Sequence, residues 1–207
     1  MPKLDHHEAV EHLKAADPKL ALLIEKVGEC RFEVRSNLNI YESLLRSITY
    51  QQLAGTAAAA ILKRVQAVFH DGDRYPTPEQ ILSAPEEVLR SAGLSRNKMM
   101  AIKDLAQKTV DGLVPTRTEA RRLTDGELIE RLTPIRGIGV WTVEMLLIFG
   151  LGRPDVLPVT DYGVRKGFQR TFKTRELPTA KQLLRRGEKW RPYRSIASWY
   201  LWRAAEM

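Results

Sequence analysis

The sequence predicts an all-α fold, because helical signals recur along most of the chain and strand signals do not. Apolar residues are spaced three and four positions apart in most segments, as on the buried face of an amphipathic helix. Capping residues and glycines separate these segments from one another. The one run that is typical of an extended chain, CRFEVRS at 30–36, has no obvious partner run and is interpreted as a connector.

The first half of the chain predicts several short helices. LALLIEKV ends at Gly28, a residue typical of a helix C-cap. The segment 41–69 carries apolar residues at helical spacing and is expected to form two helices that meet near 54–56.

Capping signals then predict the next two helix starts. Thr77 is the expected N-cap of a helix, with Gln80 completing a capping box. Ser83 and Glu86 repeat this pattern and predict a second box, for a helix that Gly93 ends. Later helices are expected at 95–110, 123–132, 140–151, 162–172, 179–189 and 193–206.

Composition limits the classes of protein to consider. A chain of 207 residues suits one domain or two closely joined lobes, and it can bury a substantial core. With 43% hydrophobic and 28% charged residues it is not a disordered protein. The polar amino terminus lacks a secretory signal, and no apolar run approaches the roughly 20 residues of a membrane span. We therefore expect a protein with no membrane association, cytoplasmic or, in a bacterium, nucleoid-associated.

Cysteine and histidine are scarce in this chain. A single Cys30 permits neither an internal disulfide nor a four-cysteine iron–sulfur cluster. His6, His7 and His12 fall on the first predicted helix, where a solvated face is favoured over a metal site. No metal site is expected.

The net charge of +8 is concentrated at one end of the chain. Residues 161–207 hold 12 Lys and Arg against 4 Asp and Glu, whereas the remainder holds 21 of each sign. Such a basic segment is typical of a surface that binds nucleic acid. A solvated basic helix face is the alternative.

The segment TPIRGIGVW at 133–141 predicts a hairpin between two helices. Pro134 ends the preceding helix, and Gly137 and Gly139 are expected to supply positive φ values for a tight reversal. The amides that follow lack acceptors within the next helix and can bind a phosphate. A plain helix connector is the alternative interpretation.

After the hairpin, the second candidate functional feature is Asp161, which lies twenty residues beyond Trp141. It precedes an amphipathic helix and is in the favoured position for an N-cap. A carboxylate near a bound nucleic-acid strand can also take part in chemistry. The two roles are compatible, because a helix N-terminus favours a negative charge.

The stretch 132–165 closely resembles the helix-hairpin-helix superfamily of DNA glycosylases, and within it the alkylpurine, or 3-methyladenine type II, family. The resemblance extends from about Tyr41 to Trp202 and is strongest at 132–168. It implies two helical lobes with a cleft between them. Lobe one is expected at about 36–153, with the hairpin at 128–150, and lobe two at 1–35 plus 154–207. Some members carry an extra N-terminal β domain, for which this chain has no room.

The resemblance implies a function in base-excision repair. Asp161 matches the family's catalytic carboxylate, which stabilises positive charge on the sugar as the N-glycosidic bond breaks. Trp141 stands where bifunctional relatives carry a Schiff-base lysine. We therefore expect a monofunctional glycosylase that releases alkylated bases and leaves an abasic site.

The family resemblance also assigns residues to base extrusion. Gln52 matches the intercalating wedge, with Leu53 as the second choice, although both could be ordinary residues at a helix end. Trp202 and Trp141 are expected to line the base pocket. Met145 stands where some relatives present an aromatic ring, which implies a roomier pocket.

Further DNA contacts follow from the same resemblance. Besides Arg136, Gly137, Ile138 and Gly139 in the hairpin, a second turn is expected to meet the opposite strand, through Gly93, Ser95 and Lys98. A plain glycine-terminated connection is an equal alternative for that turn. Arg194 is expected to contact backbone phosphate or to brace Asp161.

The expected partner is double-stranded DNA containing alkylated bases, bound by a monomer. No cofactor is expected, apart from a monovalent cation that related hairpins can bind through carbonyl groups. Two alternatives remain: a non-catalytic helix-hairpin-helix module that binds DNA, and a glycosylase for deaminated purines.

Overall fold

The computed structural model describes residues 6–35 and 37–207, and all regular structure in these residues is helical. The predicted all-α fold class is confirmed. Residues 1–5, part of the polar amino terminus, and residue 36, where the first lobe is expected to begin, lie outside the described residues.

The chain divides into two compact units. Unit 1 contains 1–35 and 147–207, and unit 2 contains 36–146. The helices of unit 1 are α1 (His6–Ala16), α2 (Pro18–Val27), α11 (Tyr162–Phe172), α12 (Ala180–Gly187), a 3₁₀ turn η2 (Glu188–Trp190) and α13 (Arg194–Glu206). Those of unit 2 are α3 (Ile40–Tyr50), α4 (Gly55–Phe69), α5 (Pro78–Ser83), α6 (Glu86–Ser91), α7 (Arg96–Val110), α8 (Arg117–Ala120), α9 (Asp125–Leu132) and α10 (Val140–Met145).

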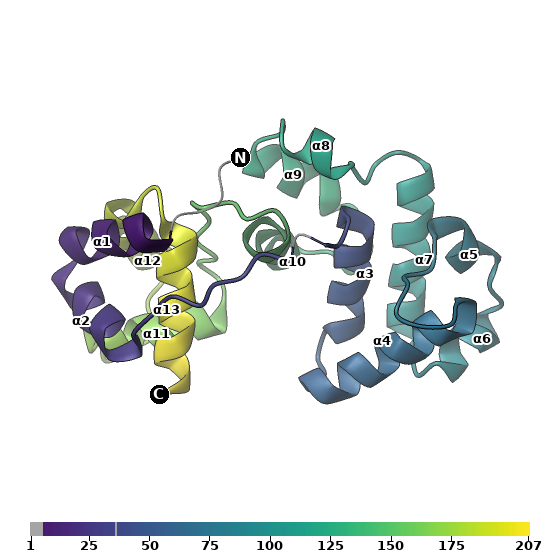
Figure 1. Cartoon of the computed structure of the whole chain (residues 1–207), viewed down its shortest axis with the longest axis horizontal. Helices are drawn as coiled ribbons and strands as arrows, with labels where there is room; N and C mark the ends of the chain where they lie inside the picture. The colour runs from purple at the N-terminus through teal and green to yellow at the C-terminus, as the bar shows by residue number, and fades with distance from the viewer. Residues whose placement is uncertain (1–5, 36) are drawn as a thin grey trace. The chain divides into compact units, whose positions relative to one another are not determined.

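Unit 1 is built around the pair α11 and α13, which lie side by side in Figure 1. α1 and α2 pack beside this pair, and their apolar faces bury Leu13 and Leu20 completely. Trp190 and Tyr200 are the largest fully buried side chains of the unit. This core fixes the two helices that carry Asp161 and Trp202.

Unit 2 is organised around α7, which packs against both α3 and α5. α7 buries Met99, Ile102 and Leu105, and α3 contributes Leu44 and Ile48. The spacing of these residues is the helical periodicity of the sequence, so the amphipathic pattern specifies which faces meet.

Short helices in this fold begin at well-formed caps. Capping boxes start five of them, at Asn39, Thr77, Thr116, Thr124 and Thr179. In each box the N-cap side chain accepts from the N3 amide while the N3 Glu or Gln accepts from the N-cap amide. The prediction for Thr77 and Gln80 is thereby confirmed.

The predicted box of Ser83 and Glu86 is wrong. Ser83 is the last residue of α5, and its hydroxyl donates to the Gln80 carbonyl. α6 begins at Glu86 behind Pro85, without a side-chain cap. Ser83 therefore satisfies the end of one helix and not the start of the next.

The expected helix at 140–151 changes its hydrogen bonding partway along. α10 ends at Met145, and a π-helical turn η1 (Leu146–Gly150) follows. A π turn inserts one extra residue per turn and rotates the side chains that come after it. The division between the two units falls within this turn, between residues 146 and 147, whereas the sequence predicts a division near 153.

Helices long and apolar enough to span a membrane are absent from the described residues.

Asp17 is the most deeply buried charge of unit 1. Its carboxylate is fully buried and accepts two hydrogen bonds of 2.7 Å from the guanidinium of Arg186. The indole Nε1–H of Trp190 also donates to it, at 3.2 Å, and the side chain caps α2. Burial alone raises the pKa of Asp17, but the hydrogen bonds from Arg186 and Trp190 outweigh it and hold the pKa below its usual value. The ionised carboxylate thus joins α2 to α12 and to Trp190.

We expect Asp17→Asn to lower the free energy of unfolding at pH 7 by about 2–4 kcal/mol, because it leaves the Arg186 guanidinium without its counter-ion while that group stays partly in water. Because the pKa of Asp17 is lower in the folded state, this carboxyl group stabilises the fold only at pH values where it is ionised. The difference in the free energy of unfolding between Asp17→Asn and the wild type should therefore become smaller below about pH 4. Urea denaturation between pH 7 and pH 3 measures both effects. Glu11→Gln, which removes an exposed pair with Lys14, is the control and should cost less than about 0.5 kcal/mol. A difference that does not change with pH would contradict this role for the carboxylate.

Candidate functional site

Two buried isoleucines anchor the hairpin between α9 and α10 in the core of unit 2. Ile135 and Ile138 are 1% and 3% exposed, and the Ile138 amide donates to the Ile135 carbonyl at 3.0 Å. Gly137 has φ +79°, as predicted, and its Cα faces the Ala101 side chain. The turn therefore rests on α7 and leaves its outer backbone exposed.

Gly139 does not have the predicted positive φ. It is the N-cap of α10 with φ −98° and ψ 173°, a conformation that any residue adopts. A Cβ at this position would meet no atom of the described chain within 4 Å. Neither backbone strain nor packing explains a glycine here, but close approach of a ligand to the backbone would.

The hairpin amides differ in their availability. The Arg136 amide already donates to Asp104 Oδ2 at 2.7 Å, and the Ile138 amide is used within the turn. The amides of Gly139 and Val140 donate no hydrogen bond to the described residues. An anion at the N-terminus of α10 would therefore meet these two amides, with the exposed Arg136 side chain nearby.

The predicted wedge lies in the turn between α3 and α4. Gln52 is exposed and adopts φ +57°, a left-handed conformation that is uncommon for a residue other than glycine. Leu53, next to it, is also exposed. The preceding Gln51 donates from its side-chain amide to the Gly137 carbonyl at 2.8 Å. This bond links the wedge turn directly to the hairpin within unit 2.

The second predicted turn lies at 93–95. Gly93 has φ +97°, and Ser95 caps α7 by accepting from the Lys98 amide. The Lys98 ammonium donates to the Thr49 carbonyl at the end of α3, and burial lowers its pKa. Lys98 thus braces the helix that leads into the wedge, and its geometry does not favour the expected phosphate contact.

Trp141 and Met145 belong to unit 2, on the first turns after the hairpin. Trp141 is 45% exposed, which is high for an indole, and Met145 is half-buried. Their neighbours on α10, Thr142 and Val143, are buried and hold the helix in the core.

Asp161 lies in unit 1 as the N-cap of α11. Its Oδ1 accepts from the Val164 amide at 2.7 Å and from the Trp202 indole Nε1–H at 2.8 Å. The residue is only 9% exposed. The carboxylate is therefore held at a fixed position at the positive end of the helix dipole.

Trp202 stands at the end of a row of aromatic rings. Its ring centroid lies 5.5 Å from that of Phe149, and Phe149 lies 5.6 Å from Phe32. The Arg35 amide donates to the Phe149 carbonyl, and its guanidinium lies over the Phe149 ring. Trp202 is a residue predicted for the base pocket, whereas Phe149 is not, and Phe149 lies in the π turn that no sequence pattern predicts.

Arg194 binds Asp155, in the loop that precedes α11. Its guanidinium donates to both carboxylate oxygens of Asp155, at 2.6 and 3.1 Å, and to the Asp155 carbonyl at 2.8 Å. Its side chain is 11% exposed. The guanidinium thus secures the start of α13 to the loop before Asp161, and its geometry favours neither a phosphate contact nor a direct contact with Asp161.

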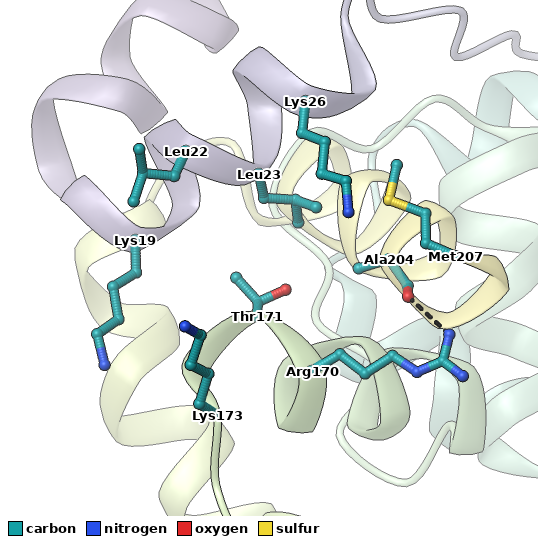
Figure 2. Close-up of a pocket in the computed structure, with 9 residues that line it drawn as sticks. All are labelled: Lys19, Leu22, Leu23, Lys26, Arg170, Thr171, Lys173, Ala204 and Met207. Atoms are coloured by element: carbon teal, nitrogen blue, oxygen red, sulfur yellow. Dashed lines mark hydrogen bonds between the residues drawn. The ribbon is translucent and has the colours of Figure 1, made fainter.

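A hollow of about 810 Å³ opens at the far end of α11 (Figure 2). It is lined by the basic side chains of Lys19, Lys26, Arg170 and Lys173 and by the apolar side chains of Leu22 and Leu23, among others. Since α11 is 11 residues long, this hollow lies roughly 16 Å along the helix from Asp161. It is therefore separate from the carboxylate and its aromatic neighbours.

Groups of three or more His, Cys, Asp or Glu side chains that could hold a metal ion are absent from the part of the chain that the structure describes. The two hairpin carbonyls of Ile135 and Gly137 each accept one hydrogen bond. A monovalent cation at the hairpin stays a prediction.

Similarity to known proteins extends over most of the chain. Residues 45–192 match the family described as HhH-GPD superfamily base excision DNA repair protein. DNA-3-methyladenine glycosylase 1 of Schizosaccharomyces pombe is 41% identical over 197 residues, which cover 95% of this chain and 86% of that protein. An alkylbase DNA glycosidase-like protein of the same organism is 32% identical and covers 98% and 95%.

Solved structures give the same result. A Schizosaccharomyces pombe 3-methyladenine DNA glycosylase in complex with abasic DNA superposes with a TM-score of 0.87 at 40% identity, covering 97% of both chains. A DNA-3-methyladenine glycosidase from Bacillus halodurans superposes with a TM-score of 0.84 at 37% identity, covering 95% of this chain and 88% of that one. The chain belongs to the HhH-GPD superfamily of base excision DNA repair proteins.

Proposed function

We propose that this protein is a monofunctional DNA glycosylase of the 3-methyladenine type, which hydrolyses the N-glycosidic bond of alkylated bases and leaves an abasic site. The observation that carries the proposal is the placement of Asp161. A nearly buried carboxylate caps α11 and is hydrogen-bonded to the indole of Trp202. Relatives named as 3-methyladenine glycosylases support the choice of substrate class.

The chemistry needs a fixed negative charge more than a strong acid. When the bond from C1′ to the base breaks, its electron pair leaves with the base and positive charge develops on the deoxyribose. The Asp161 carboxylate stabilises that charge and orients the attacking water, whose oxygen forms the new bond to C1′ and whose proton is released. Bases alkylated at N3 or N7 carry positive charge beforehand and depart neutral, so little protonation is required.

Aromatic rings suit such a base, because a cation stacks favourably on an electron-rich face. We assign Trp202 of unit 1 to this role, with Phe149 supporting it from behind at 5.5 Å. Trp141 and Met145 of unit 2 are proposed as further base contacts. A methionine in place of an aromatic side chain gives an adaptable surface that accepts several alkylated bases.

Backbone amides are proposed to anchor the strand. Gly139 and Val140 offer amides at the N-terminus of α10, and the glycine at 139 lets a phosphate approach closely. Arg136 adds a positive charge there. The turn containing Gly93 and Ser95 is proposed to meet the opposite strand.

The turn between α3 and α4 is proposed to insert the wedge when the base is extruded, with Gln52 as the intercalating side chain and Leu53 beside it. The left-handed conformation of Gln52 is typical of strained backbone at a functional position. Gln51 would hold this turn at the hairpin that binds the phosphate.

The reaction uses water as the nucleophile and requires no cofactor. We propose that the protein acts as a monomer on double-stranded DNA containing alkylated bases, in the cytoplasm, and in association with the nucleoid if the cell is bacterial. If Asp161 has no part in a reaction, the remaining hypothesis is a non-catalytic module that binds DNA through the same hairpin.

Asp161→Asn is expected to lower the rate of base release by about 10²- to 10³-fold, because it removes the charge that stabilises the sugar cation. Asparagine retains an Oδ1 that can accept from Val164 and Trp202, and it is an equally good N-cap, so the fold should persist. Release of methylated purines from alkylated duplex DNA under single-turnover conditions measures the rate. Binding to duplex DNA with an abasic site should stay unchanged or become tighter.

The matched control is Asp111→Asn, an exposed aspartate at the end of α7. It should retain the wild-type rate. Full activity of Asp161→Asn would show that the proposed mechanism is wrong, and absence of base release from the wild-type protein would favour the non-catalytic module.

A second expectation follows from the indole at position 141, which cannot form a Schiff base. Incubation with DNA containing an abasic site and sodium borohydride should give no covalent complex, and the abasic strand should stay intact without alkali. A bifunctional glycosylase serves as the positive control. Formation of a covalent complex would contradict the monofunctional assignment. Lys166, whose ammonium donates to Gln169, is then the first lysine to test. Loss of the complex in Lys166→Met would identify it as the nucleophile.

Gln51→Ala is expected to loosen the wedge turn, because it removes the hydrogen bond to the Gly137 carbonyl. Losing about 1 kcal/mol should raise amide exchange at 50–54 and 136–139 about fivefold. Hydrogen–deuterium exchange measures this change. Gln107→Ala, which removes a surface bond to Asp111, is the control and should leave both segments unchanged. Unaltered exchange in Gln51→Ala would mean that the turn is held by other contacts.

A further inference from the structure

One face of α11 carries two glycines in its first two turns. Gly163 and Gly167 are four residues apart and therefore lie on the same face of the helix. Neither residue has a positive φ, so the backbone conformation does not require glycine at these positions. The face they form is turned toward α13, the partner with which α11 makes its most extensive contact (Figure 1).

At Gly167 the two helices touch through their backbones. A Cβ placed on Gly167 would lie 1.8 Å from the Leu201 carbonyl oxygen and 2.5 Å from its carbon. Backbone atoms cannot move aside without moving the whole helix. The glycine at 167 therefore sets how closely α13 approaches α11.

A second connection lies at the C-terminal end of the pair. The Arg170 guanidinium donates to the Ala204 and Ala205 carbonyls, at 3.2 and 2.7 Å. Figure 2 shows Arg170 reaching across to α13 at Ala204. These are carbonyls of the last turn of α13, which lack partners within their own helix. The bonds fix the position of α13 along α11.

The third connection lies beside Asp161. A Cβ on Gly163 would be 2.7 Å from Cδ1 and 3.2 Å from Nε1 of Trp202, and 3.2 Å from Asp161 Oδ1. The indole edge formed by Cδ1 and Nε1 thus lies directly against the backbone of the first turn of α11. A second neighbour of the indole is Phe149, whose ring centroid lies 5.5 Å from that of Trp202 and whose plane is inclined to it by 32°.

We propose that Gly163 is a positioning residue for the catalytic carboxylate. The space left by its missing side chain lets the Cδ1–Nε1 edge of Trp202 lie against α11 and direct its Nε1–H to Asp161 Oδ1. Gly167 and Arg170 maintain the approach of α13 that brings Trp202 to this place. The inference rests on the proposed role of Asp161 and extends it to the residue that keeps the carboxylate and its donor together.

The geometry indicates the effect of a single methyl group. Ordinary van der Waals contact begins near 3.4 Å, so alanine at 163 requires a shift of 0.7 Å between its Cβ and Trp202 Cδ1. The hydrogen bond from Trp202 Nε1 to Asp161 Oδ1 is 2.8 Å long, and such a shift lengthens or bends it. Displacements of about 1 Å in a catalytic group can reduce rates 100-fold.

The test is Gly163→Ala in otherwise unchanged protein. We expect base release from duplex DNA methylated with dimethyl sulfate to fall about 10- to 100-fold under single-turnover conditions. Affinity for a duplex with an abasic site and the melting temperature should stay near wild type, since alanine favours a helix more than glycine does. A rate within about twofold of wild type, outside the range expected from such a displacement, would overturn the proposal.

The chain provides a matched control at Gly126. This glycine is also the second residue of its helix, α9, behind a threonine N-cap, and a Cβ there meets nothing within 4 Å. Gly126→Ala should therefore retain the wild-type rate. It reports the effect of the same substitution at the same helix position without a neighbouring indole.

A double-variant cycle separates positioning from a loss of fold. Phenylalanine at 202 is smaller and has no Nε1–H, so Trp202→Phe relieves the contact and removes the hydrogen bond together. Gly163→Ala should then cost no more than about twofold in a Trp202→Phe background. An equal loss in both backgrounds would mean that Gly163 acts otherwise, and this comparison stays valid even if Gly163→Ala alone folds poorly.

A spectroscopic measurement is independent of activity. In ¹⁵N-labelled protein without DNA, the indole Nε1–H resonance of Trp202, assigned by its absence in Trp202→Phe, should shift upfield in Gly163→Ala and not in Gly126→Ala. An unchanged resonance in Gly163→Ala would contradict only the positioning role of Gly163. Full activity of Asp161→Asn would contradict the proposed function instead, so the two outcomes can be distinguished.

Discussion

The two hydrogen bonds accepted by one carboxylate oxygen organise the candidate active site. Asp161 Oδ1 receives the Val164 amide at 2.7 Å and the Trp202 indole at 2.8 Å. The first bond fixes where α11 begins, and the second joins that helix to α13. The same oxygen that starts a helix therefore also places an aromatic ring beside the carboxylate. The helix dipole favours the negative charge at this end, so capping, packing and charge stabilisation all place the carboxylate in one position.

Features that depend on local chemistry could be predicted from the sequence. Thr77 with Gln80, Gly28 and the cap at Asp161 are determined by residues within one or two turns, and the structure has each of them. The amphipathic spacing likewise predicts an all-α chain. The prediction at Ser83 is wrong for a local reason, since the hydroxyl has a competing acceptor in the Gln80 carbonyl behind it. A capping pattern shows which groups can bond and does not show which acceptor is closer.

Features that depend on distant partners could not be predicted in this way. The hydrogen bond from Gln51 to Gly137 joins residues that are 86 positions apart, and Arg194 and Asp155, which form an ion pair, are 39 positions apart. The π turn at 146–150 is a change of hydrogen bonding that no spacing of apolar residues signals, and it brings Phe149 beside Trp202. The role of Gly163 is likewise not visible in the sequence, because a glycine near a helix start has no pattern of its own. Its role exists only once α13 lies against it.

The basic carboxy-terminal segment illustrates why charge alone is weak support for a DNA-binding surface. Several of its arginines have internal partners: Arg186 pairs with Asp17, and Arg191 and Arg194 share Asp155. Those two carboxylates lie outside 161–207, so they offset part of the excess charge counted in that segment. Arg165 and Arg170 direct their guanidinium groups to backbone carbonyls. These five of the twelve Lys and Arg residues in the segment hold parts of unit 1 together. The proposed contact with a DNA phosphate then depends chiefly on geometry. The exposed amides of Gly139 and Val140 can be approached by a DNA strand, because position 139 has no side chain.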